Sequence, residues 1–363
     1  MNMKVWDIAV IPGDGIGKEV VPEAIRVLDT IAGLHGKFRF NYTYYPWSSE
    51  YYVEHGEMMP ENGLELLSKS DAIFLGAVGN PDIVADHVSL AGLLIKIRRG
   101  FEQVINIRPA KQVKGVTSPL ANPKDFDIMV VRENSEGEYS SIGGRVHSGD
   151  DEICIQNSVF TKRAVAQVME YAFELARTRG KRLTSATKSN GIVHSMPFWD
   201  EVLKEVSANH EDIQVNNFHI DALSAYFVTK PETLDVVVAS NLFGDILSDI
   251  GAAIMGNIGI APAANINLNG KYPSMFEPVH GSAPDIVGKG IANPIGQIWT
   301  AKMMLDHFGE HEIAEQLLDA IEIVMQSGIK TADIGGKSTT TEVTDAIISQ
   351  LLVVNSENLA KST

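Results

Sequence analysis

The chain alternates between short runs of apolar residues and longer segments in which apolar residues recur every three or four positions. Short apolar runs are typical of buried strands, and the longer periodic segments are typical of amphipathic helices. Their regular alternation predicts an α/β fold. The predicted strands include 5–11, 38–45, 72–75, 182–186 and 213–220, and the predicted helices include 17–32, 90–101, 161–179, 194–208, 294–307, 310–327 and 341–353.

One stretch in the middle of the chain combines a buried strand with acidic residues. Residues 234–239 form an apolar, β-branched run, and Ser240 and Asn241 offer a helix N-cap after it. Asp245 and Asp249 follow four residues apart, so a helix places both carboxylates on one face. Carboxylate oxygens suit Mg²⁺ or Mn²⁺. A solvated acidic face is the alternative, although the apolar residues around the pair make it less attractive here.

Glycine-rich turns follow two predicted strands near the start of the chain. Residues 12–17 read P-G-D-G-I-G, and residues 76–79 read G-A-V-G. The first has G-x-G-x-G spacing, and no acidic residue ends a second strand at the distance that the usual dinucleotide fingerprint requires. We therefore interpret both as tight turns that bring backbone close to a ligand.

Three arginines accompany the acidic pair. Arg98 lies on a predicted helix, Arg108 follows ten residues later, and Arg132 ends the apolar run 128–132. A guanidinium at a strand end can bind a carboxylate through two parallel hydrogen bonds. Each arginine alone is more often a surface residue. Together with Asp245 and Asp249 they suggest a di- or tricarboxylate held between a metal ion and guanidinium groups.

Composition limits the classes of binding partner and the compartment that we expect for this protein. The 363 residues have room for two domains, and the formal net charge of −16 argues against nucleic acid or an anionic membrane as a partner. The single cysteine, Cys154, excludes an internal disulfide and fits a reducing compartment. The start of the chain lacks a signal-peptide pattern, and no apolar run reaches membrane-spanning length. We expect a soluble cytoplasmic protein.

Four motifs extend these features into a family resemblance. They are Asn241–Asp249 (N-L-F-G-D-I-L-S-D), Glu277–Asp285 (E-P-V-H-G-S-A-P-D), 107–110 (I-R-P-A), and 131–133 (V-R-E) with Tyr139. With them, the sequence resembles the metal-dependent, NAD-linked β-decarboxylating dehydrogenases of the isocitrate/isopropylmalate dehydrogenase family over about residues 4 to 353. Agreement of that extent is too long to arise by chance.

The resemblance implies a fold that the residue pattern alone does not give. It is a non-Rossmann fold of two α/β domains around a shared mixed sheet. Both chain ends, 1–103 and 256–363, would form the large, NAD-binding domain. Residues 104–255 would form the small domain, with a dimer interface and a protruding arm at about 139–157. The active sites would lie in the clefts of a homodimer and be shared between subunits.

The resemblance also assigns roles to matching positions. Asp245 and Asp249 would bind Mn²⁺ or Mg²⁺ together with Asp221 from the other subunit. Lys188, also from the partner, would accept the proton of the substrate hydroxyl, and Tyr139 would protonate carbon after CO₂ leaves. A lysine near a metal ion and arginines suits that role, because those charges favour its neutral form. The substrate carboxylates would contact Arg98, Arg108 and Arg132.

The cofactor site implied by the resemblance lies mainly in one segment. Asn190 would help to place the nicotinamide, and the segment from Glu277 to Asn293 would bind adenosine. Asp285 favours NAD, because a carboxylate accepts from a ribose 2′-hydroxyl and repels a 2′-phosphate. A monovalent cation such as K⁺ is a further candidate. The cofactor-binding residues expected in the segment are Glu277, His280, Gly281, Ser282, Ala283, Asp285, Ile286 and Asn293.

Substrate choice within the family depends on the helix that carries Arg98. Residues 47–52 and 86–99 look most like the tartrate/D-malate branch, which predicts oxidation and decarboxylation of a C4 hydroxydiacid. That branch usually has tryptophan where this chain has Ala91, and the isopropylmalate branch usually has glutamate. Ala91 could open room for a substituent on the third carbon of the substrate, and Leu94 could line the same pocket or pack the helix. 3-Isopropylmalate dehydrogenase is therefore the alternative.

The sequence argues against two other classes of protein. A non-catalytic regulatory subunit of the NAD-isocitrate dehydrogenase type would be expected to lack Tyr139, Lys188 or a metal-binding aspartate, and all are present. An Mg²⁺-dependent phosphate hydrolase would need a phosphate-binding loop such as G-x-x-x-x-G-K-[ST], which the sequence lacks. The sequence leaves open the physiological substrate, the reaction outcome between oxidation alone and decarboxylation, and the assembly beyond a dimer.

Overall fold

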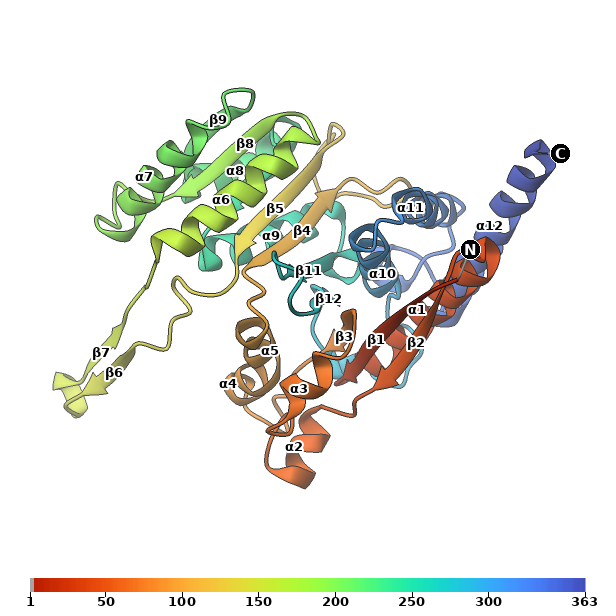
Figure 1. The fold of residues 1–363 in the computed structure, drawn as a ribbon, viewed down its shortest axis with the longest axis horizontal. Helices are drawn as coiled ribbons and strands as arrows, with labels where there is room; N and C mark the ends of the chain where they lie inside the picture. The colour runs from red at the N-terminus through yellow and green to blue at the C-terminus, as the bar shows by residue number, and fades with distance from the viewer. Residues whose placement is uncertain (1–2, 363) are drawn as a thin grey trace. The chain divides into compact units, whose positions relative to one another are not determined.

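The computed structural model describes residues 3–362, and the chain divides into two compact units. We call Met1–Glu102, Gln112–Pro119 and Met255–Thr363 the end unit, and Gln103–Lys111 and Leu120–Ile254 the middle unit. Each contains a mixed sheet with helices packed on it, as Figure 1 shows. The prediction of a two-part α/β fold with mixed strand directions is confirmed. Within the described residues, no helix is both long and apolar enough to cross a membrane.

The end unit has five strands in the order β2-β1-β3-β12-β11. β1 pairs in parallel with β2 and β3, β12 is parallel to β3, and β11 is antiparallel to β12. The strands are β1 (Lys4–Gly13), β2 (Phe38–Tyr44), β3 (Ala72–Ala77), β11 (Pro262–Ile266) and β12 (Ser274–Pro278). The helices are α1 (Gly17–His35), α2 (Ser49–His55), α3 (Gly63–Leu67), α4 (Asp86–Ser89), α5 (Ile95–Gly100), α10 (Ile295–His307), α11 (His311–Gln326) and α12 (Thr340–Ser362).

Alternating residues of the end-unit strands face different helices. On one side of the sheet, Ala9 and Ile11 of β1 join a buried cluster with Leu93, Ile97 and Phe101. The helices α1 and α10 pack on the other side of these strands. This is the period of two that a sheet with both faces covered produces. The turn formed by 112–119, which we assigned to the middle range, belongs to the end unit. Its Gly115 carbonyl accepts from Lys330, and a Cβ at Gly115 would lie 2.4 Å from the Gln326 nitrogen.

The middle unit has five strands in the order β4-β5-β10-β8-β9 and a separate hairpin, β6-β7. In the five-strand order, β4 is antiparallel to β5 and the other neighbours are parallel, and the hairpin strands β6 and β7 are antiparallel. α6 and α7 cover one face, and α8 and α9 lie on the other (Figure 1). The strands are β4 (Ile105–Lys111), β5 (Asp127–Glu133), β6 (Gly143–Val146), β7 (Ile153–Gln156), β8 (Arg182–Thr187), β9 (Gln214–His219) and β10 (Val236–Ala239), and the helices are α6 (Lys162–Arg177), α7 (Ser195–Ser207), α8 (Ile220–Thr229) and α9 (Asn241–Met255).

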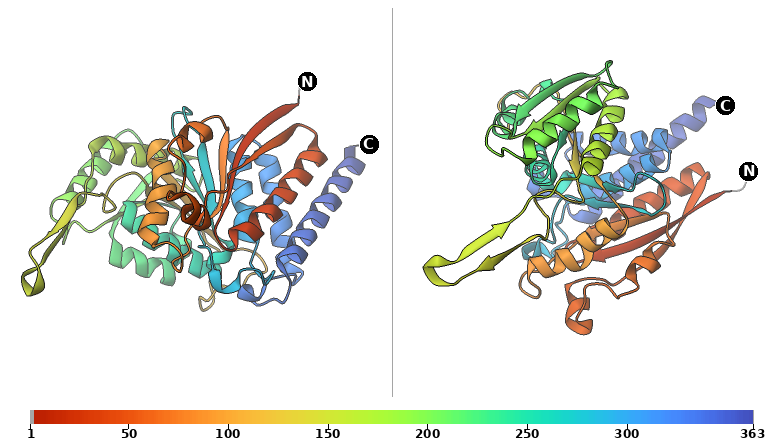
Figure 2. Two further views of the ribbon diagram at one scale, coloured as in Figure 1. Left: turned by 90° about the horizontal axis from the view of Figure 1, so that it is seen from below. Right: turned by 60° about the vertical axis from the view of Figure 1, so that its left-hand side comes forward.

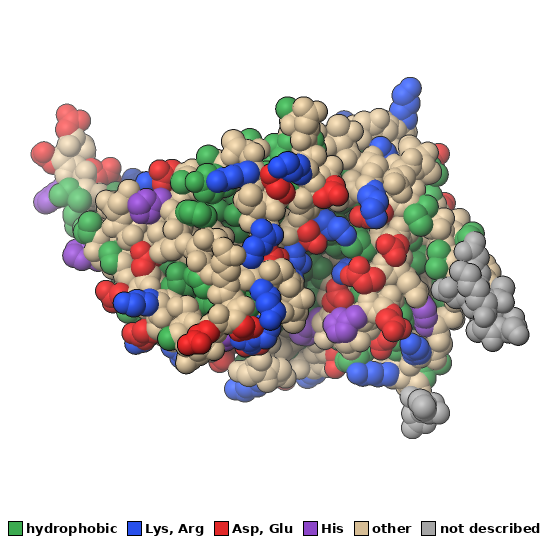
Figure 3. All heavy atoms as spheres, turned by 90° about the horizontal axis from the view of Figure 1, so that it is seen from above, with side chains coloured by type: hydrophobic (Ala, Val, Ile, Leu, Met, Phe, Trp, Pro, Cys, Tyr) green, Lys and Arg blue, Asp and Glu red, His purple; other side chains and the backbone are tan. Residues whose placement is uncertain are grey.

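The hairpin predicted at about 139–157 is present, and it extends away from the rest of the middle unit (Figure 2). All its strand residues are exposed, including Val146, Ile153 and Ile155. Figure 3 shows hydrophobic, acidic and histidine side chains mixed at this end of the molecule. An isolated two-stranded hairpin is marginally stable in water, and this one exposes its apolar side chains.

Candidate active site

The acidic pair lies where the sequence predicts it, on the helix after a buried strand. All four residues of β10 are buried, and α9 begins two residues later at Asn241. Asp245 and Asp249 are one helical turn apart, and their side chains are 33% and 60% exposed. Gly244 lets the helix approach β5, because a Cβ there would lie 2.6 Å from Cβ of Arg132. The strand-to-helix junction therefore presents both carboxylates to the edge of the sheet.

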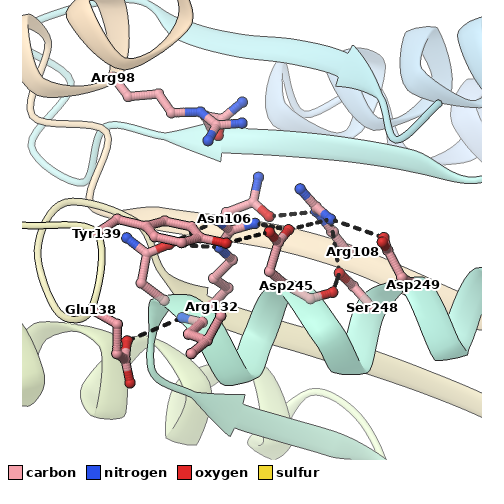
Figure 4. A network of polar contacts seen from close by, with 12 residues as sticks. Arg98, Asn106, Arg108, Arg132, Glu138, Tyr139, Asp245, Ser248 and Asp249 are labelled. Carbon is pink, nitrogen blue, oxygen red and sulfur yellow. Dashed lines mark hydrogen bonds and ion pairs between the residues drawn. The ribbon is translucent and has the colours of Figure 1, made fainter. Parts of the chain in front are cut away.

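Two buried arginines hold the acidic pair. Nη1 of Arg108 lies 3.2 Å from Asp245, 3.7 Å from Asp249 and 2.8 Å from Oγ of Ser248. Nη1 of Arg132 also binds Asp245. Both arginines are fixed from behind by amides, since Asn106 accepts from Nε of Arg108 and Asn241 accepts from Nε and Nη2 of Arg132. Figure 4 shows these groups converging on Asp245.

Tyr139 completes this cluster. Its hydroxyl donates to Oδ2 of Asp245 over 2.8 Å, and its ring lies 5.6 Å from the Arg132 guanidinium (Figure 4). Burial and the neighbouring Asp245 carboxylate raise the pKa of the Tyr139 hydroxyl above its usual value. The hydroxyl therefore keeps its proton at neutral pH, as a general acid must before it acts.

Asp249 is the less compensated carboxylate. Burial raises its pKa most, and the nearby Asp245 adds to that effect, while Arg108 opposes it. A cation between the two carboxylates would oppose both effects, burial and repulsion by Asp245, because it stabilises the charged form of Asp249. Two half-exposed carboxylates on one helix face are a donor set that fits Mg²⁺ or Mn²⁺. The described part of a single chain contains no group of three or more His, Cys, Asp or Glu side chains arranged for a metal, so these two carboxylates alone would not complete a metal site.

Lys188 and Asp221 lie together elsewhere in the middle unit. Lys188 follows β8, Asp221 is at the start of α8, and Nζ of Lys188 donates to Oδ1 of Asp221 over 2.7 Å. This hydrogen bond lowers the pKa of the Asp221 carboxyl. Asn190 is exposed in the turn after Lys188, where Gly191 and Ile192 donate to the Lys188 carbonyl. Within one chain these residues pair with each other, and Asp221 does not join Asp245 and Asp249.

Arg98 belongs to the end unit and has a partner that the sequence did not suggest. Its Nη2 lies 2.5 Å from Oε1 of Glu277, and Asn265 donates to the same oxygen over 2.8 Å. All three residues are buried. Glu277, a predicted cofactor-binding residue, thus contacts Arg98 in this structure. Ala91 and Leu94 lie just before it in a π-helical turn, Leu90–Leu94, with Ala91 exposed and Leu94 half-buried.

The predicted adenosine segment contains an unsatisfied polar atom. Nδ1 of buried His280 donates to the Gly281 carbonyl over 2.9 Å, and Nε2 is buried without a hydrogen-bond partner among the described residues. Burial lowers the pKa of His280, so Nε2 is a neutral acceptor. Gly281 has open space around its Cα, and Asp285 is exposed. These features fit a ligand with hydrogen-bond donors, as a dinucleotide has.

The remaining residues of this segment are held by the end unit itself. Ser282 is buried, and its carbonyl accepts from Ile16 over 2.9 Å. Ala283 has φ of 43° before the short turn Pro284–Ile286, which contains Ile286. Nδ2 of Asn293 donates to Asp333 over 3.0 Å, and its Oδ1 accepts from Ile295. Asn293 is thus oriented by Asp333, a residue that the sequence motifs did not single out.

Several residues of the site were missed from the sequence although a signal existed. Asn106 lies two positions before Arg108 on β4, and Ser248 lies three positions after Asp245 on α9. A spacing of two on a strand places Asn106 on the same face as Arg108, and a spacing of three on a helix places Ser248 on the same face as Asp245. Asn265 had no such local signal, because it meets Glu277 across a strand pair.

The chain is similar in sequence to a family of known enzymes. The family model "Isocitrate/isopropylmalate dehydrogenase" matches residues 7–347. A probable tartrate dehydrogenase/decarboxylase of Bacillus subtilis is 64% identical over 97% of this chain and 99% of its own length. The D-malate dehydrogenase [decarboxylating] of Escherichia coli is 55% identical over 96% and 99%.

Solved structures support the same assignment. The crystal structure of isocitrate dehydrogenase from Methylococcus capsulatus superposes with a TM-score of 0.84 at 30% identity, covering 95% of this chain and 99% of that one. The predicted resemblance and the prediction of an enzyme are confirmed. By motif, fold and overall similarity, the chain belongs to the isocitrate/isopropylmalate dehydrogenase family.

Proposed function

We propose that this enzyme oxidises and decarboxylates D-malate or tartrate, with NAD as oxidant and Mn²⁺ or Mg²⁺ as metal cofactor. The observation that carries the proposal is the convergence of Arg108, Arg132 and Tyr139 on Asp245. Guanidinium groups, a proton donor and carboxylates for a metal ion are together what a hydroxydiacid substrate requires. The two relatives named for tartrate and D-malate support the substrate class.

Each residue has a chemical task in this proposal. Asp245, Asp249 and Asp221 of the partner subunit would hold the metal ion, which when bound polarises the hydroxyl and, later, the keto oxygen. Arg108 and Arg132 would bind substrate carboxylates, and Arg98, whose guanidinium pairs with Glu277, would have the same task. Lys188 of the partner subunit would accept the hydroxyl proton as hydride leaves the adjacent carbon for NAD.

Tyr139 acts after the carbon–carbon bond breaks. Loss of CO₂ leaves an electron pair on the neighbouring carbon, and the Tyr139 hydroxyl supplies the proton that this carbon accepts. The raised pKa of Tyr139 keeps that proton in place until then. The tyrosine would be reprotonated from solvent, since 42% of the residue is exposed.

The choice of NAD over NADP rests on Asp285. It is exposed at the short turn after Ala283, and its carboxylate can accept from a ribose 2′-hydroxyl. Lys289 is nearby in sequence and would moderate the repulsion of a 2′-phosphate. A requirement for a monovalent cation such as K⁺ is part of the same proposal and is tested in the same assay.

The homodimer is supported by exposed apolar residues in the middle unit. On the hairpin, Val146 is 51% exposed and Ile153 and Ile155 are each 50% exposed. Val228 on α8 and Ile246 on α9 are 50% and 45% exposed. Replacing Ile153 and Ile155 with aspartate should give a monomer in analytical ultracentrifugation, with loss of turnover, whereas the matched surface change Ile323→Asp on α11 should leave both unchanged.

Isopropylmalate is the second candidate substrate, because Ala91 is exposed and Leu94 half-buried beside Arg98. The test is NADH formation, followed by absorbance, with D-malate, L-tartrate, meso-tartrate, isopropylmalate and isocitrate, each with and without Mn²⁺ and K⁺. We expect the C4 acids to give the highest kcat/KM and Mn²⁺ to be essential. Turnover with isopropylmalate but not D-malate would overturn the substrate assignment.

A further inference from the structure

Asp14 is a buried carboxylate that the proposed chemistry does not use. It lies in the glycine-rich turn after β1 and is 1% exposed. Its Oδ1 accepts from the backbone nitrogen of Ser49 over 2.7 Å, and its Oδ2 accepts from Oγ of Ser49 over 3.0 Å and from the nitrogen of Gly79 over 2.8 Å. All three donors are uncharged, so among the described residues the carboxylate is held by hydrogen bonds and not by an ion pair.

These bonds join turns that follow three neighbouring strands. Asp14 follows β1, Ser49 begins α2 after β2, and Gly79 follows β3 with φ of 109°. β1 pairs in parallel with both β2 and β3, so the carboxyl ends of all three strands lie at one edge of the sheet. In open α/β sheets, ligands bind outside this edge. The carboxylate thus ties together the turns at the edge where a ligand is expected.

The same turn supports the predicted adenosine segment. The nitrogen of Ile16 donates to the carbonyl of Ser282 over 2.9 Å. A Cβ at Gly15 would lie only 2.0 Å from that carbonyl oxygen, so the contact is between two backbones and requires glycine. The backbone N–H of Asp14 also donates a hydrogen bond to the Ala77 carbonyl over 2.7 Å. A displacement of the Asp14 turn must therefore displace Ser282 and the neighbouring Ala283.

We propose that Asp14 is a positioning residue for the dinucleotide, because its carboxylate locks the glycine turn, the start of α2 and the Gly79 turn into one platform under Ser282. The inference rests on the proposed use of NAD at this edge of the end unit. Because Asp14 is buried and its oxygens accept from Ser49 and Gly79, we expect it to govern cofactor affinity and not the chemical step.

Asp14→Asn is the informative change. It preserves shape but replaces one oxygen with an NH₂ group. In one orientation this group faces the Gly79 N–H, and in the other it faces the Ser49 N–H, so two donors oppose each other either way. We expect the KM for NAD and the Kd for NADH to rise at least about fivefold, with kcat and the KM for the hydroxy acid within about twofold of wild type.

Two further variants make the result interpretable. Ser49→Ala removes only one of the three hydrogen bonds and should raise the Kd for NADH by a smaller factor, which provides a result if Asp14→Asn fails to fold. Asp71→Asn is the matched control: its Oδ2 accepts from the Asp7 nitrogen over 2.8 Å near the amino-terminal ends of β1 and β3. It should leave NADH binding unchanged.

NADH binding is measured by fluorescence titration of the full-length protein, with circular dichroism as the check on folding. A purely structural role for Asp14 would lower the melting temperature without changing the Kd for NADH, and that result would overturn the inference. If wild type binds NADPH but not NADH, the NAD assignment fails while the Asp14 comparison is made with NADPH. If wild type binds neither, both proposals fall.

Discussion

The acidic cluster of the middle unit and the glycine turn of the end unit are organised by opposite means. Around Asp245, charged groups of both signs contact one another directly, and much of the pair Asp245 and Asp249 remains exposed. Around Asp14, a single buried carboxylate is surrounded by neutral donors and close backbone contacts. The first arrangement suits charged ligands whose charge changes during reaction, and the second suits a fixed surface for a cofactor. Substitutions should therefore alter turnover in the first region and cofactor affinity in the second.

The largest effect is expected for Asp245→Asn. It removes the charge that both arginines and Tyr139 contact, together with a proposed metal ligand. Losing several kcal/mol of transition-state stabilisation corresponds to a fall of roughly 10³-fold or more in kcat/KM. The control is Asp212→Asn, since Asp212 pairs with Nε of Arg177 at 3.1 Å in the same unit and has no proposed role. Steady-state NADH formation measures both, and equal activities would exclude the cluster as the active site.

A smaller but more specific effect is expected for Tyr139→Phe. The ring can stay beside Arg132 while the proton donor is lost, so overall turnover should fall by about 10²- to 10³-fold. Because hydride transfer precedes protonation, the first turnover should still give a burst of NADH in stopped-flow absorbance. Tyr171→Phe on α6 is the matched control. A loss of the burst would show that Tyr139 acts before CO₂ leaves.

Asp285→Lys tests the end unit through the preference for NAD over NADP and not through the rate of turnover. Reversing this charge should lower the ratio of kcat/KM for NAD to that for NADP by at least about tenfold, since a lost hydrogen bond and a relieved repulsion act together. Asp319→Lys, a charge reversal on the exposed face of α11, should leave the ratio unchanged. An unchanged ratio in Asp285→Lys would place the ribose elsewhere.

The smallest effect concerns stability and pH. Because the folded state raises the pKa of Asp249, its contribution to stability is present below the ordinary pKa of aspartate and is lost as the pH rises through the folded value. Asp249→Asn mimics the protonated form, so without metal it should melt slightly above wild type at pH 7, and the difference should vanish near pH 3. Added Mn²⁺ should raise the melting temperature of wild type and not of the variant.

Asp212 has a pKa shift of the opposite sign to that of Asp249 and serves as the reference for the melting experiment. The Arg177 hydrogen bond lowers its pKa, so its stabilising contribution is present above the ordinary value and is lost as the pH falls through the folded value. Asp212→Asn should therefore melt below wild type at pH 7. Differential scanning calorimetry from pH 3 to 8 measures both variants. The same sign in both would contradict the assigned environments.

The sequence predicted the parts of the site that depend on local pattern. The buried run of β10 followed by Asp245 and Asp249 on α9 needed only strand length, a cap and a spacing of four. The pairing of Arg98 with Glu277 could not be foreseen, because 179 residues separate them. Likewise, nothing local marks Asp14 as the acceptor for Ser49 and Gly79, since only the order of three strands brings these turns together.

The π-helical turn Leu90–Leu94 makes the surface beside Arg98 sensitive to a change in chain length. It holds one more residue than an α-helical turn would, directly before the segment that carries Arg98. Deleting a single residue there would rewind the segment and rotate the preceding apolar side chains by about 100° relative to the arginine. With Glu277 holding Arg98 downstream, such a deletion would change which side chains of this turn are exposed while Arg98 kept its partner.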